Sequence, residues 1–558
     1  MKTTDIDHIF STLRLPKPDI ELLAFCGGNK VSKVNAWVNN LKTTQTINTC
    51  NQLYQAIAQI LRLKTTAPER KAMLDELFLT AYTSCLSLGK EFLNQPLSLP
   101  EPAQKSAMLG QAILKSLAAG YLLYLQKAYT EKKLKDTQLT QAAEAAHSAL
   151  QCLALMQLRN QQLYSQATPI IWRYANALIQ LTDHLNIGET LVKSVLPECQ
   201  APTPNQAYLR IVALAGAQLN QLTQIDMHNV FNALGQWSAI LKFSDEPTTF
   251  WVDLQQDGAP QSQKRKCSPE SGRIIHIDFS ALTRQLSRFI AGDGPAIGNG
   301  AQMRLPLEIN LPTVVHLESA WSRSSLRSDE RRTSTHTAEI IIGFQQCHSK
   351  LSGVDDFNVF LGDNISAPKN TDMLTNLMSS LTPADNANTK TTHAFTPLKV
   401  TTQNISKDGY CLLWEGSQSV RIHAGDVVII REHAKRDWGI GVIRWIRQLK
   451  QHSILGVQLI DTKPQAVGAS CHYKEGGYSD FMRAFLLPGL HSHHNPSLLT
   501  ANLLFNEHTK VKIKANASHP PVQSKILDCQ ITTGKVKVFE LQKVDLSNQV
   551  NSAQMHEL

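Results

Sequence analysis

The apolar residues of this chain change their spacing partway along it, and this change constrains the fold most. From about 46 to 245 they recur three or four positions apart, as in Leu53, Ile57 and Ile60, which is the spacing of one helix face. From residue 337 onward they form short β-branched runs such as Ala338–Phe344, which are typical of strands. The pattern predicts a multidomain α + β protein, with an all-α region first and an antiparallel β region after it.

The N-terminal region is expected to be a helical scaffold. Helices are predicted at 103–130, 137–165, 169–183, 205–222 and 227–242. Residues 1–45 are predicted to be an irregular lead-in, because prolines and glycines interrupt them at Pro16, Pro18, Gly27 and Gly28. Antiparallel helices of this length form bundles or solenoids, and no clean 34-residue repeat distinguishes the two.

Residues 246–322 are predicted to connect the helical and β regions. A short strand leading into a helix is expected at 274–289, and a further helix at 307–321, although Pro312 lies inside it. The glycine-rich run 292–298 neither follows a strand nor opens a helix, so it is interpreted as a turn and not as a phosphate-binding loop. Lys264-Arg265-Lys266 is interpreted as an exposed charged loop.

The C-terminal part is expected to contain a closed β-barrel. Short strands are predicted at 398–400, 409–414, 427–430, 438–446 and 454–459, a spacing typical of barrels. Two further strands, at 510–514 and 535–541, predict a small β appendage. The expected domains are a helical scaffold at 1–245, the connector, a barrel at 323–470 with an insertion near 348–395, and the appendage with its tail at 471–558.

Composition favours a globular cytoplasmic protein. Hydrophobic residues make up 42% of the chain, and the formal net charge is +9. The most apolar stretch, 113–125, carries Lys115 and is too short to cross a bilayer, and the N-terminus lacks the apolar core of a signal peptide. The ten cysteines include no Cys-x-x-Cys pair, which indicates reduced thiols in the cytosol.

Two polar motifs carry the candidate chemistry. The first is an arginine cluster, Arg323-Ser-Ser-Leu-Arg327-Ser-Asp-Glu-Arg331-Arg332, and the second is Asn404-x-Ser406-x-x-Gly409. An arginine fork binds phosphate oxygens or a guanine edge and stacks on a purine. The asparagine amide and the serine hydroxyl offer hydrogen bonds to a base or phosphate, and the glycine lets the backbone turn or lets a ligand approach closely.

Residues 323–465 resemble a PilZ domain. The two motifs carry the resemblance together with Val420-x-x-x-x-Gly425-Asp426-x-Val428, Gly441-Val-Ile-Arg444-Trp445 and Leu455–Leu459. The resemblance implies a β-barrel that binds cyclic di-GMP. The ligand residues it implies are Arg327, Arg331, Arg332, Asn404, Ser406 and Gly409.

The arginine half of this prediction leaves its register open. Arg323 with Arg327 and Arg327 with Arg331 both have the Arg-x-x-x-Arg spacing. Asn404 also follows Arg331 by more positions than in most PilZ domains, which the insertion near 348–395 would absorb at a small entropic cost.

The predicted function is that of an effector or adaptor, not an enzyme. Cyclic di-GMP is the expected ligand, without a cofactor, and the helical region is expected to bind a protein partner. One alternative is a nucleotide-independent scaffold with a degenerate barrel. The other is nucleic-acid binding through the basic barrel face, although strand alternation more simply places Trp438 and Trp445 inside the barrel and the arginines outside.

Two remaining motifs are given structural interpretations. His491-Ser-His-His494 has metal-ligating side chains but no cysteine or carboxylate nearby, so we expect an exposed linker and no metal site. Cys347-His348 lacks a third group to complete a catalytic set, so Cys347 is expected to be a core thiol.

Overall fold

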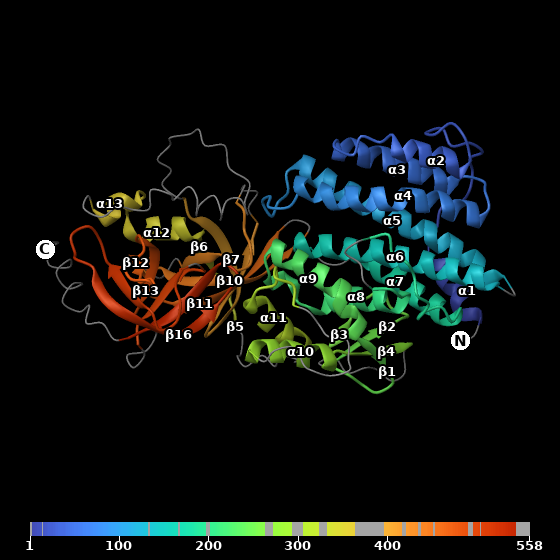
Figure 1. Cartoon of the computed structure of the whole chain (residues 1–558). Helices are drawn as coiled ribbons and strands as arrows, with labels where there is room; N and C mark the ends of the chain where they lie inside the picture. Colours follow the sequence, from blue (N-terminus) through green and yellow to red (C-terminus); the bar gives the residue numbers. More distant parts are fainter. Residues whose placement is uncertain are drawn as a thin grey trace. The chain divides into compact units, whose positions relative to one another are not determined.

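The chain folds as two compact units, shown in the computed structural model of Figure 1. One consists of residues 1–220 and 224–326, and the other of residues 221–223 and 327–558. The structure describes residues 3–13, 15–131, 134–165, 168–196, 201–262, 272–292, 305–322, 332–362, 396–415, 420–432, 437–449, 452–488, 495–502 and 504–542.

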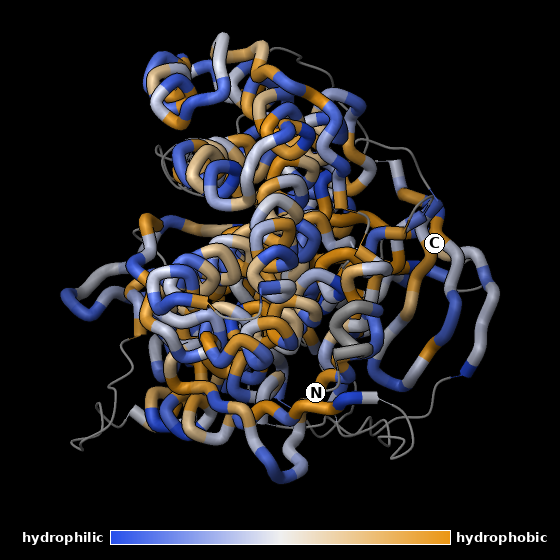
Figure 2. Tube along the Cα trace, turned by 90° about the vertical axis from the view of Figure 1, so that its right-hand side faces the viewer, coloured by the Kyte–Doolittle hydropathy of each residue, from blue (hydrophilic) through white to orange (hydrophobic). Residues whose placement is uncertain are grey.

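Long helices dominate the first unit, as predicted. They are α1 (Thr3–Thr12), α2 (Val31–Asn39), α3 (Thr46–Arg62), α4 (Ala67–Ser87), α5 (Glu101–Thr130), α6 (Asp136–Gln162), α7 (Pro169–His184), α8 (Pro204–Gly216) and α9 (Gln224–Trp237). The five helices predicted from 103 onward are confirmed, with the last two ending earlier than expected. Figure 2 shows apolar segments along the helices of this unit, where the buried residues form its core.

The prediction of an irregular lead-in at 1–45 is wrong. Helices α1 and α2 occupy parts of it, and the prolines and glycines lie between them, where they separate two helices and interrupt neither. Val34 of α2 is fully buried, so the second of these helices contributes to the core of the unit.

Small residues let the central helices approach closely. Ala142, Ala145 and Ala149 of α6 are fully buried, and α5 and α6 pack along their length. At Gly120 of α5, an added Cβ would lie 2.4 Å from a methyl carbon of Leu74 on α4. These positions tolerate only small side chains, because a larger one would push the helices apart.

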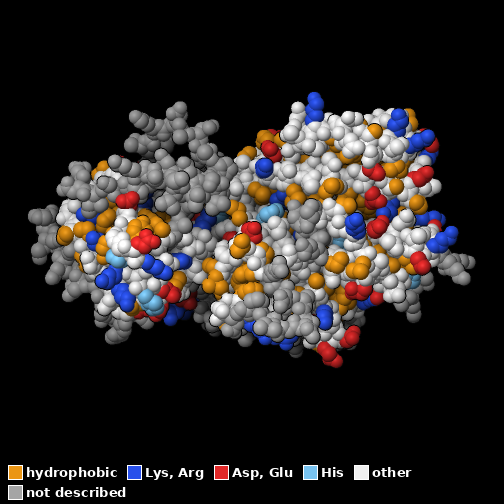
Figure 3. Space-filling view, in the orientation of Figure 1, with side chains coloured by type: hydrophobic (Ala, Val, Ile, Leu, Met, Phe, Trp, Pro, Cys, Tyr) orange, Lys and Arg blue, Asp and Glu red, His pale blue; other side chains and the backbone are white. Residues whose placement is uncertain are grey.

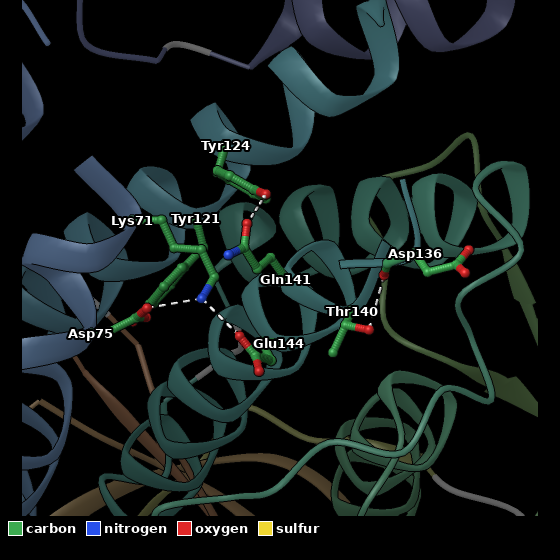
Figure 4. Close-up of polar contacts among 8 residues, drawn as sticks. All are labelled: Lys71, Asp75, Tyr121, Tyr124, Asp136, Thr140, Gln141 and Glu144. Atoms are coloured by element: carbon green, nitrogen blue, oxygen red, sulfur yellow. Dashed lines mark hydrogen bonds and ion pairs between the residues drawn. The ribbon is translucent and has the colours of Figure 1, made fainter. Parts of the chain in front are cut away.

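A polar network joins α4, α5 and α6 (Figure 4). Lys71 Nζ donates to Asp75 Oδ2 at 2.8 Å and to Glu144 Oε2 at 2.9 Å, and the Tyr121 hydroxyl donates to Asp75 Oδ1 at 3.0 Å. The Lys71 side chain is only 8% exposed, whereas each carboxylate is about half-exposed. A lysine that bridges two carboxylates fixes the three helices relative to one another.

Replacing Lys71 with methionine should destabilise the helical unit by about 2 kcal/mol. The substitution removes a buried charge with both of its ion pairs, but the two carboxylates are exposed enough for water to compensate in part. The measurement is urea unfolding followed by far-ultraviolet circular dichroism. K105M is the matched control, because Lys105 pairs with Glu101 in an i,i+4 bridge whose two side chains are each 75% exposed. Equal stability of K71M and K105M would contradict the role assigned to the network.

Helix α5 is long and apolar enough to cross a membrane by length and composition. However, 61% of its most apolar window is buried inside the unit. A core helix of a soluble protein meets the same criteria, and the burial of α5 against α3, α4 and α6 matches that case.

A small sheet and two helices follow the long helices. Strands β1 (Lys242–Ser244), β2 (Phe250–Asp253), β3 (Gln261–Ser262) and β4 (Ile274–Asp278) form a sheet of order β1-β4-β2-β3. Helices α10 (Ser280–Ala291) and α11 (Leu311–Ser322) confirm the predicted strand–helix pair and the later helix. Pro312 is tolerated because it lies in the first turn of α11, where a backbone N–H has no helical partner. Residues 264–266 and 293–298 lie outside the described residues.

The second unit contains the predicted barrel. Its strands are β5 (Arg332–Thr333), β6 (Thr337–Ile342), β7 (Leu398–Ser406), β8 (Gly409–Trp414), β9 (Val427–Glu432), β10 (Gly439–Gln448) and β11 (Ser453–Asp461). The sheet order is β5-β7-β6-β9-β10-β11-β8, and β7 also pairs with β8. This extra pairing closes six antiparallel strands into a barrel, with β5 attached to β7. Helices α12 (Phe344–Ser352) and α13 (Phe357–Leu361) lie between β6 and β7 in the chain, and residues 363–395 lie outside the described residues.

The predicted β appendage is itself a closed barrel. Its strands are β12 (Gln465–Cys471), β13 (Met482–Leu487), β14 (Ser497–Ala501), β15 (Lys510–Lys514), β16 (Val522–Thr532) and β17 (Val536–Leu541), in the cyclic order β12-β13-β14-β17-β16-β15. Only β15 and β17 were expected from the sequence. The others escape notice because β12 consists mainly of small residues and β16 is rich in polar ones, so neither forms a clear β-branched run.

The two barrels share a hydrophobic core. Val427, Ile429 and Ile440 of the first barrel pack in one buried cluster with residues of β13, β14 and β17 from the second. At the edge of this cluster, Lys535 Nζ donates to Asp426 Oδ1 at 2.5 Å. The pair of barrels therefore forms one packed body.

Candidate functional site

The Asn-x-Ser-x-x-Gly motif forms the tight hairpin between β7 and β8. Asn404 and Ser406 lie at the end of β7, and Gly409 begins β8. Ser406 is the register partner of Gly409, and its hydroxyl is 3.4 Å from the Gly409 carbonyl oxygen to which it donates. The hairpin turn thus holds all three motif residues at one end of the barrel.

The end of the arginine cluster lies against this hairpin. Strand β5 pairs with β7 so that Arg332 is opposite Ile405 and Thr333 is opposite Asn404. The Ser334 N–H also donates to the Gln403 carbonyl oxygen at 3.1 Å. Arg323, Arg327 and Arg331 lie outside the described residues, but the chain enters β5 directly after them. Two motifs that are far apart in sequence therefore meet at β5 and β7.

A cavity of about 230 Å³ opens at this end of the barrel, and the motif residues line it. Its walls come from the β7–β8 hairpin and from β10 and β11. The lining residues are Asn404, Ser406, Asp408, Gly409, Tyr410, Cys411, Arg444, Trp445, Gly456, Val457 and Gln458. Six of the eleven therefore lie in the hairpin, and the other five lie on β10 and β11.

A β-bulge explains how two consecutive residues of β10 line the same cavity. Ile443 is opposite Val457 and Trp445 is opposite Gly456, which leaves Arg444 without a partner residue on β11. A bulge inserts one extra residue and changes the direction of the neighbouring side chains. Arg444 is exposed, as the predicted alternation has it, but Trp445 is only partly buried and lines the same cavity as Arg444.

Glycines on the neighbouring strands make room for the cavity wall. An added Cβ at Gly456 would lie 2.0 Å from the indole nitrogen of Trp445, so the indole lies directly over this glycine. An added Cβ at Gly409 would lie 2.1 Å from the Val457 carbonyl oxygen. Gly409 is thus required by the close approach of β8 to β11.

Replacing Gly409 with alanine should destabilise the barrel by about 1–3 kcal/mol, because the methyl group would displace the backbone of β11. Thermal unfolding followed by tryptophan fluorescence measures this loss. Gly258→Ala is the control, since a Cβ at Gly258 meets nothing within 4 Å. If G409A were as stable as G258A, this would contradict the prediction, because it would mean that β8 and β11 can move apart to admit the methyl group without loss of stability.

Several polar groups face the cavity without a partner. Within the described part of the chain, the side chains of Asn404, Arg444 and Gln458 make no hydrogen bond or ion pair. Nearby protein atoms desolvate the Arg444 guanidinium and lower its pKa, yet its side chain stays exposed and arginine stays charged at neutral pH. The cavity thus offers a cation and two amides to a ligand.

Tyr410 is held differently from these groups. Its hydroxyl donates to Glu432 Oε1 at 3.0 Å. Burial, reinforced by the Glu432 carboxylate, raises the pKa of Tyr410 well above its ordinary value. Tyr410 therefore stays protonated and shapes the cavity wall, with its polar end directed to Glu432.

Sequence reasoning did not assign Arg444, Trp445, Tyr410 or Gln458 to the site. The sequence places Arg444 and Trp445 in a PilZ-like strand motif and on a possible basic face for nucleic acid, and strict alternation puts these neighbours on opposite faces. Gln458 lies on β11 opposite Gly409, a register that becomes visible only when the barrel closes. The signal that the sequence does contain is the pair Gly456 and Trp445, whose close packing requires the absence of a side chain.

The other candidate motifs do not form a site. Cys347 is a core thiol, as predicted: it is fully buried and donates to the Ile341 carbonyl oxygen at 3.3 Å. Burial lowers the pKa of His348 to about 4, so this histidine is neutral at physiological pH. The histidine run 491–494 and the basic pair at 435–436 lie outside the described residues.

Three protein-family models match consecutive parts of this chain. Residues 32–248 match the family model described as the N-terminal domain of the cyclic-di-GMP receptor FimW. Residues 249–394 and 367–466 match the model of its middle PilZ domain, and residues 467–544 match that of the FimW C-terminal β-barrel domain. The matches follow one another along the chain in the order helical region, first barrel and second barrel.

A curated relative matches over nearly the full length. The cyclic-di-GMP receptor FimW of Pseudomonas aeruginosa is 25% identical over 580 aligned positions, which cover 96% of this chain and 94% of the relative. None of the matched families is described as an enzyme. The chain therefore belongs to the PilZ-domain proteins, with the three-domain organisation of the FimW family.

Proposed function

We propose that this chain is a cyclic di-GMP receptor that binds the nucleotide at the β7–β8 end of the first barrel. The observation that carries the proposal is the pairing of β5 with β7, in which Arg332 is opposite Ile405 and Thr333 is opposite Asn404, so that the arginine cluster ends next to the motif that lines the cavity. The family membership supports it, because the relative from Pseudomonas aeruginosa is described as a cyclic-di-GMP receptor.

The cavity side chains suit the two kinds of groups in such a ligand. The amides of Asn404 and Gln458 would hydrogen-bond a guanine edge, and the Ser406 hydroxyl would donate to a base or phosphate oxygen. The exposed Arg444 guanidinium would bind a phosphate or stack on a base. The Trp445 indole, which lies over Gly456, offers a flat surface for stacking.

The size of the cavity implies that the arginine segment completes the site. Pockets for drug-sized ligands usually measure about 300–1,000 Å³, and this one measures about 230 Å³. It would therefore hold only part of a dinucleotide. Arg327 and Arg331, which precede Arg332 in the sequence, would bind the remaining phosphate and guanine groups.

This arrangement would couple binding to the helical region. The arginine segment connects the end of α11 at Ser322 to the start of β5 at Arg332. A ligand that fixes the segment against the hairpin would constrain the connection between the two units. We propose that the helical region communicates this change to a protein partner, in the cytoplasm.

Displacement of fluorescent cyclic di-GMP tests the assignment of the site. Unlabelled cyclic di-GMP should displace it, while cyclic di-AMP should do so much more weakly, because adenine lacks the acceptor O6. Asn404→Ala and Ser406→Ala should each weaken binding by roughly tenfold. Asn39→Ala, at an exposed position of α2 in the helical unit, is the control. Unchanged affinity in both cavity variants would exclude this cavity as the binding site.

A further inference from the structure

The outer surface of the second barrel carries a group of unneutralised lysines. Lys510 and Lys525 are both exposed and lie directly opposite each other on β15 and β16. Lys512 lies two residues along β15 on the same face, next to His472 and Tyr478. We call these five residues the lysine face. Figure 3 shows Lys, Arg and His side chains gathered on the visible surface of this barrel.

Nothing in the described structure neutralises this charge. Like charges directly opposite each other in antiparallel strands are destabilising. The register partners of Lys512 are Ser470 and Gln523, and the N–H of Gln542 donates to the Lys525 carbonyl oxygen. No ion pair links any of the three lysines to another described residue. Residues 465–542 contain eight Lys and Arg against five Asp and Glu.

The chemistry of the lysine face favours carboxylates over nucleic acid. Lys512 Nζ lies 4.0 Å from the centre of the Tyr478 ring, and His472 packs on the same ring with centroids 5.0 Å apart. This ring is therefore not free to stack on a base. Tyr473, which is 45% exposed, is a single ring, whereas binding of single strands uses successive aromatic rings. Lysines also lack the planar fork with which arginine binds phosphate in two places.

A membrane and a second copy of the chain fit this face less well. Membrane-surface binding buries exposed apolar side chains beneath the basic ones. The lysine face has none, because its other members are His472 and Tyr478. A second copy would carry the same formal charge of +9, so its approach would be opposed by electrostatic repulsion.

We propose that the lysine face is a docking surface for an acidic segment of a partner protein. The segment would lie across β15 and β16, with its carboxylates between Lys510 and Lys525. This would convert a destabilising pair of like charges into ion pairs. The face lies on the second barrel and the nucleotide cavity lies on the first, so this inference does not depend on the proposed nucleotide site.

The test measures binding of a fluorescein-labelled peptide of alternating Glu and Gly to the full-length chain at low ionic strength. Binding should be saturable and should be lost at ~0.5 M salt, where the screening length falls to a few ångströms. K525E should weaken binding by roughly tenfold. It should leave the melting temperature unchanged or higher, since it places a carboxylate opposite Lys510. K115E is the control, because Lys115 is exposed on α5 of the helical unit.

Each outcome supports or overturns the proposal. Loss of peptide binding in K525E with a fully folded barrel, and normal binding by K115E, would support it. Equal binding by K525E and the unchanged chain would overturn it. Tighter binding of a thymidine oligonucleotide, or of vesicles containing phosphatidylglycerol, with the same dependence on Lys525, would replace the acidic segment by that partner.

Discussion

Replacing Arg327 and Arg331 together with alanine should weaken the binding of cyclic di-GMP on the order of 100-fold. A hydrogen bond to a charged group contributes about 1.5–3 kcal/mol, so each arginine is expected to contribute about tenfold or more. Calorimetric titration of the double variant measures the loss.

Single variants would then determine the register of the arginine pair. Arg323→Ala should bind almost normally if the pair is Arg327 with Arg331, and should lose as much as Arg327→Ala if the pair is Arg323 with Arg327. Arg332→Ala reports on the residue that β5 holds opposite Ile405. Affinity that is unchanged in the double variant would show that the barrel does not bind the nucleotide through this segment.

Replacing Asp426 with asparagine should destabilise the pair of barrels by about 2–3 kcal/mol at neutral pH. Asp426 Oδ2 accepts from the His423 N–H at 2.7 Å, and Oδ1 accepts from Lys535 Nζ in the second barrel. Burial alone would raise the pKa of Asp426, but Lys535 and His423 lower it to about 2. The carboxylate is 13% exposed, so water compensates little for the lost ion pair. Urea unfolding followed by tryptophan fluorescence measures the difference.

The same residue predicts how stability depends on pH. The pKa of Asp426 is about 2 in the folded chain and has its ordinary value of 3.8 in the unfolded chain. A lowered folded pKa stabilises the fold above pH ~4, and the contribution of about 2.5 kcal/mol is lost as the pH falls through ~2. The unchanged chain should lose this stability in acid, while D426N should not. Asp408→Asn, at an exposed hairpin position, is the control. If the stability of D426N and that of the unchanged chain fell in parallel with decreasing pH, this would contradict the role assigned to the Asp426–Lys535 ion pair between the two barrels.

The elements that the sequence predicted well are those that a local pattern specifies. The helices from 103 to 242 follow from apolar periodicity and terminal prolines, and β8 to β11 follow from β-branched runs bounded by turns. The second barrel was predicted only in part. Strands such as β12 and β16 are recognisable mainly by their pairing across the barrel, and pairing depends on residues far away in the chain.

Of the residues at the candidate site, those in a contiguous motif could likewise be predicted from the sequence, whereas those brought in by strand pairing could not. Asn404, Ser406 and Gly409 form a contiguous motif, and the structure places them together in one hairpin. Arg332 joins them only through β5, a strand of two residues that no periodicity predicts. Arg444 and Trp445 reach the same cavity only because a bulge interrupts alternation in β10. The sequence analysis expects Gly409 to allow either a backbone turn or the approach of a ligand, whereas the structure shows that the close backbone of Val457 already requires a glycine at this position.

Calorimetric titration of the unmodified full-length chain with cyclic di-GMP tests the central claim most directly. The account predicts saturable binding with a dissociation constant in the micromolar range or below, which corresponds to about −8 kcal/mol or more favourable. The absence of heat and of any other binding signal at tens of micromolar nucleotide, with the chain folded, would contradict the claim.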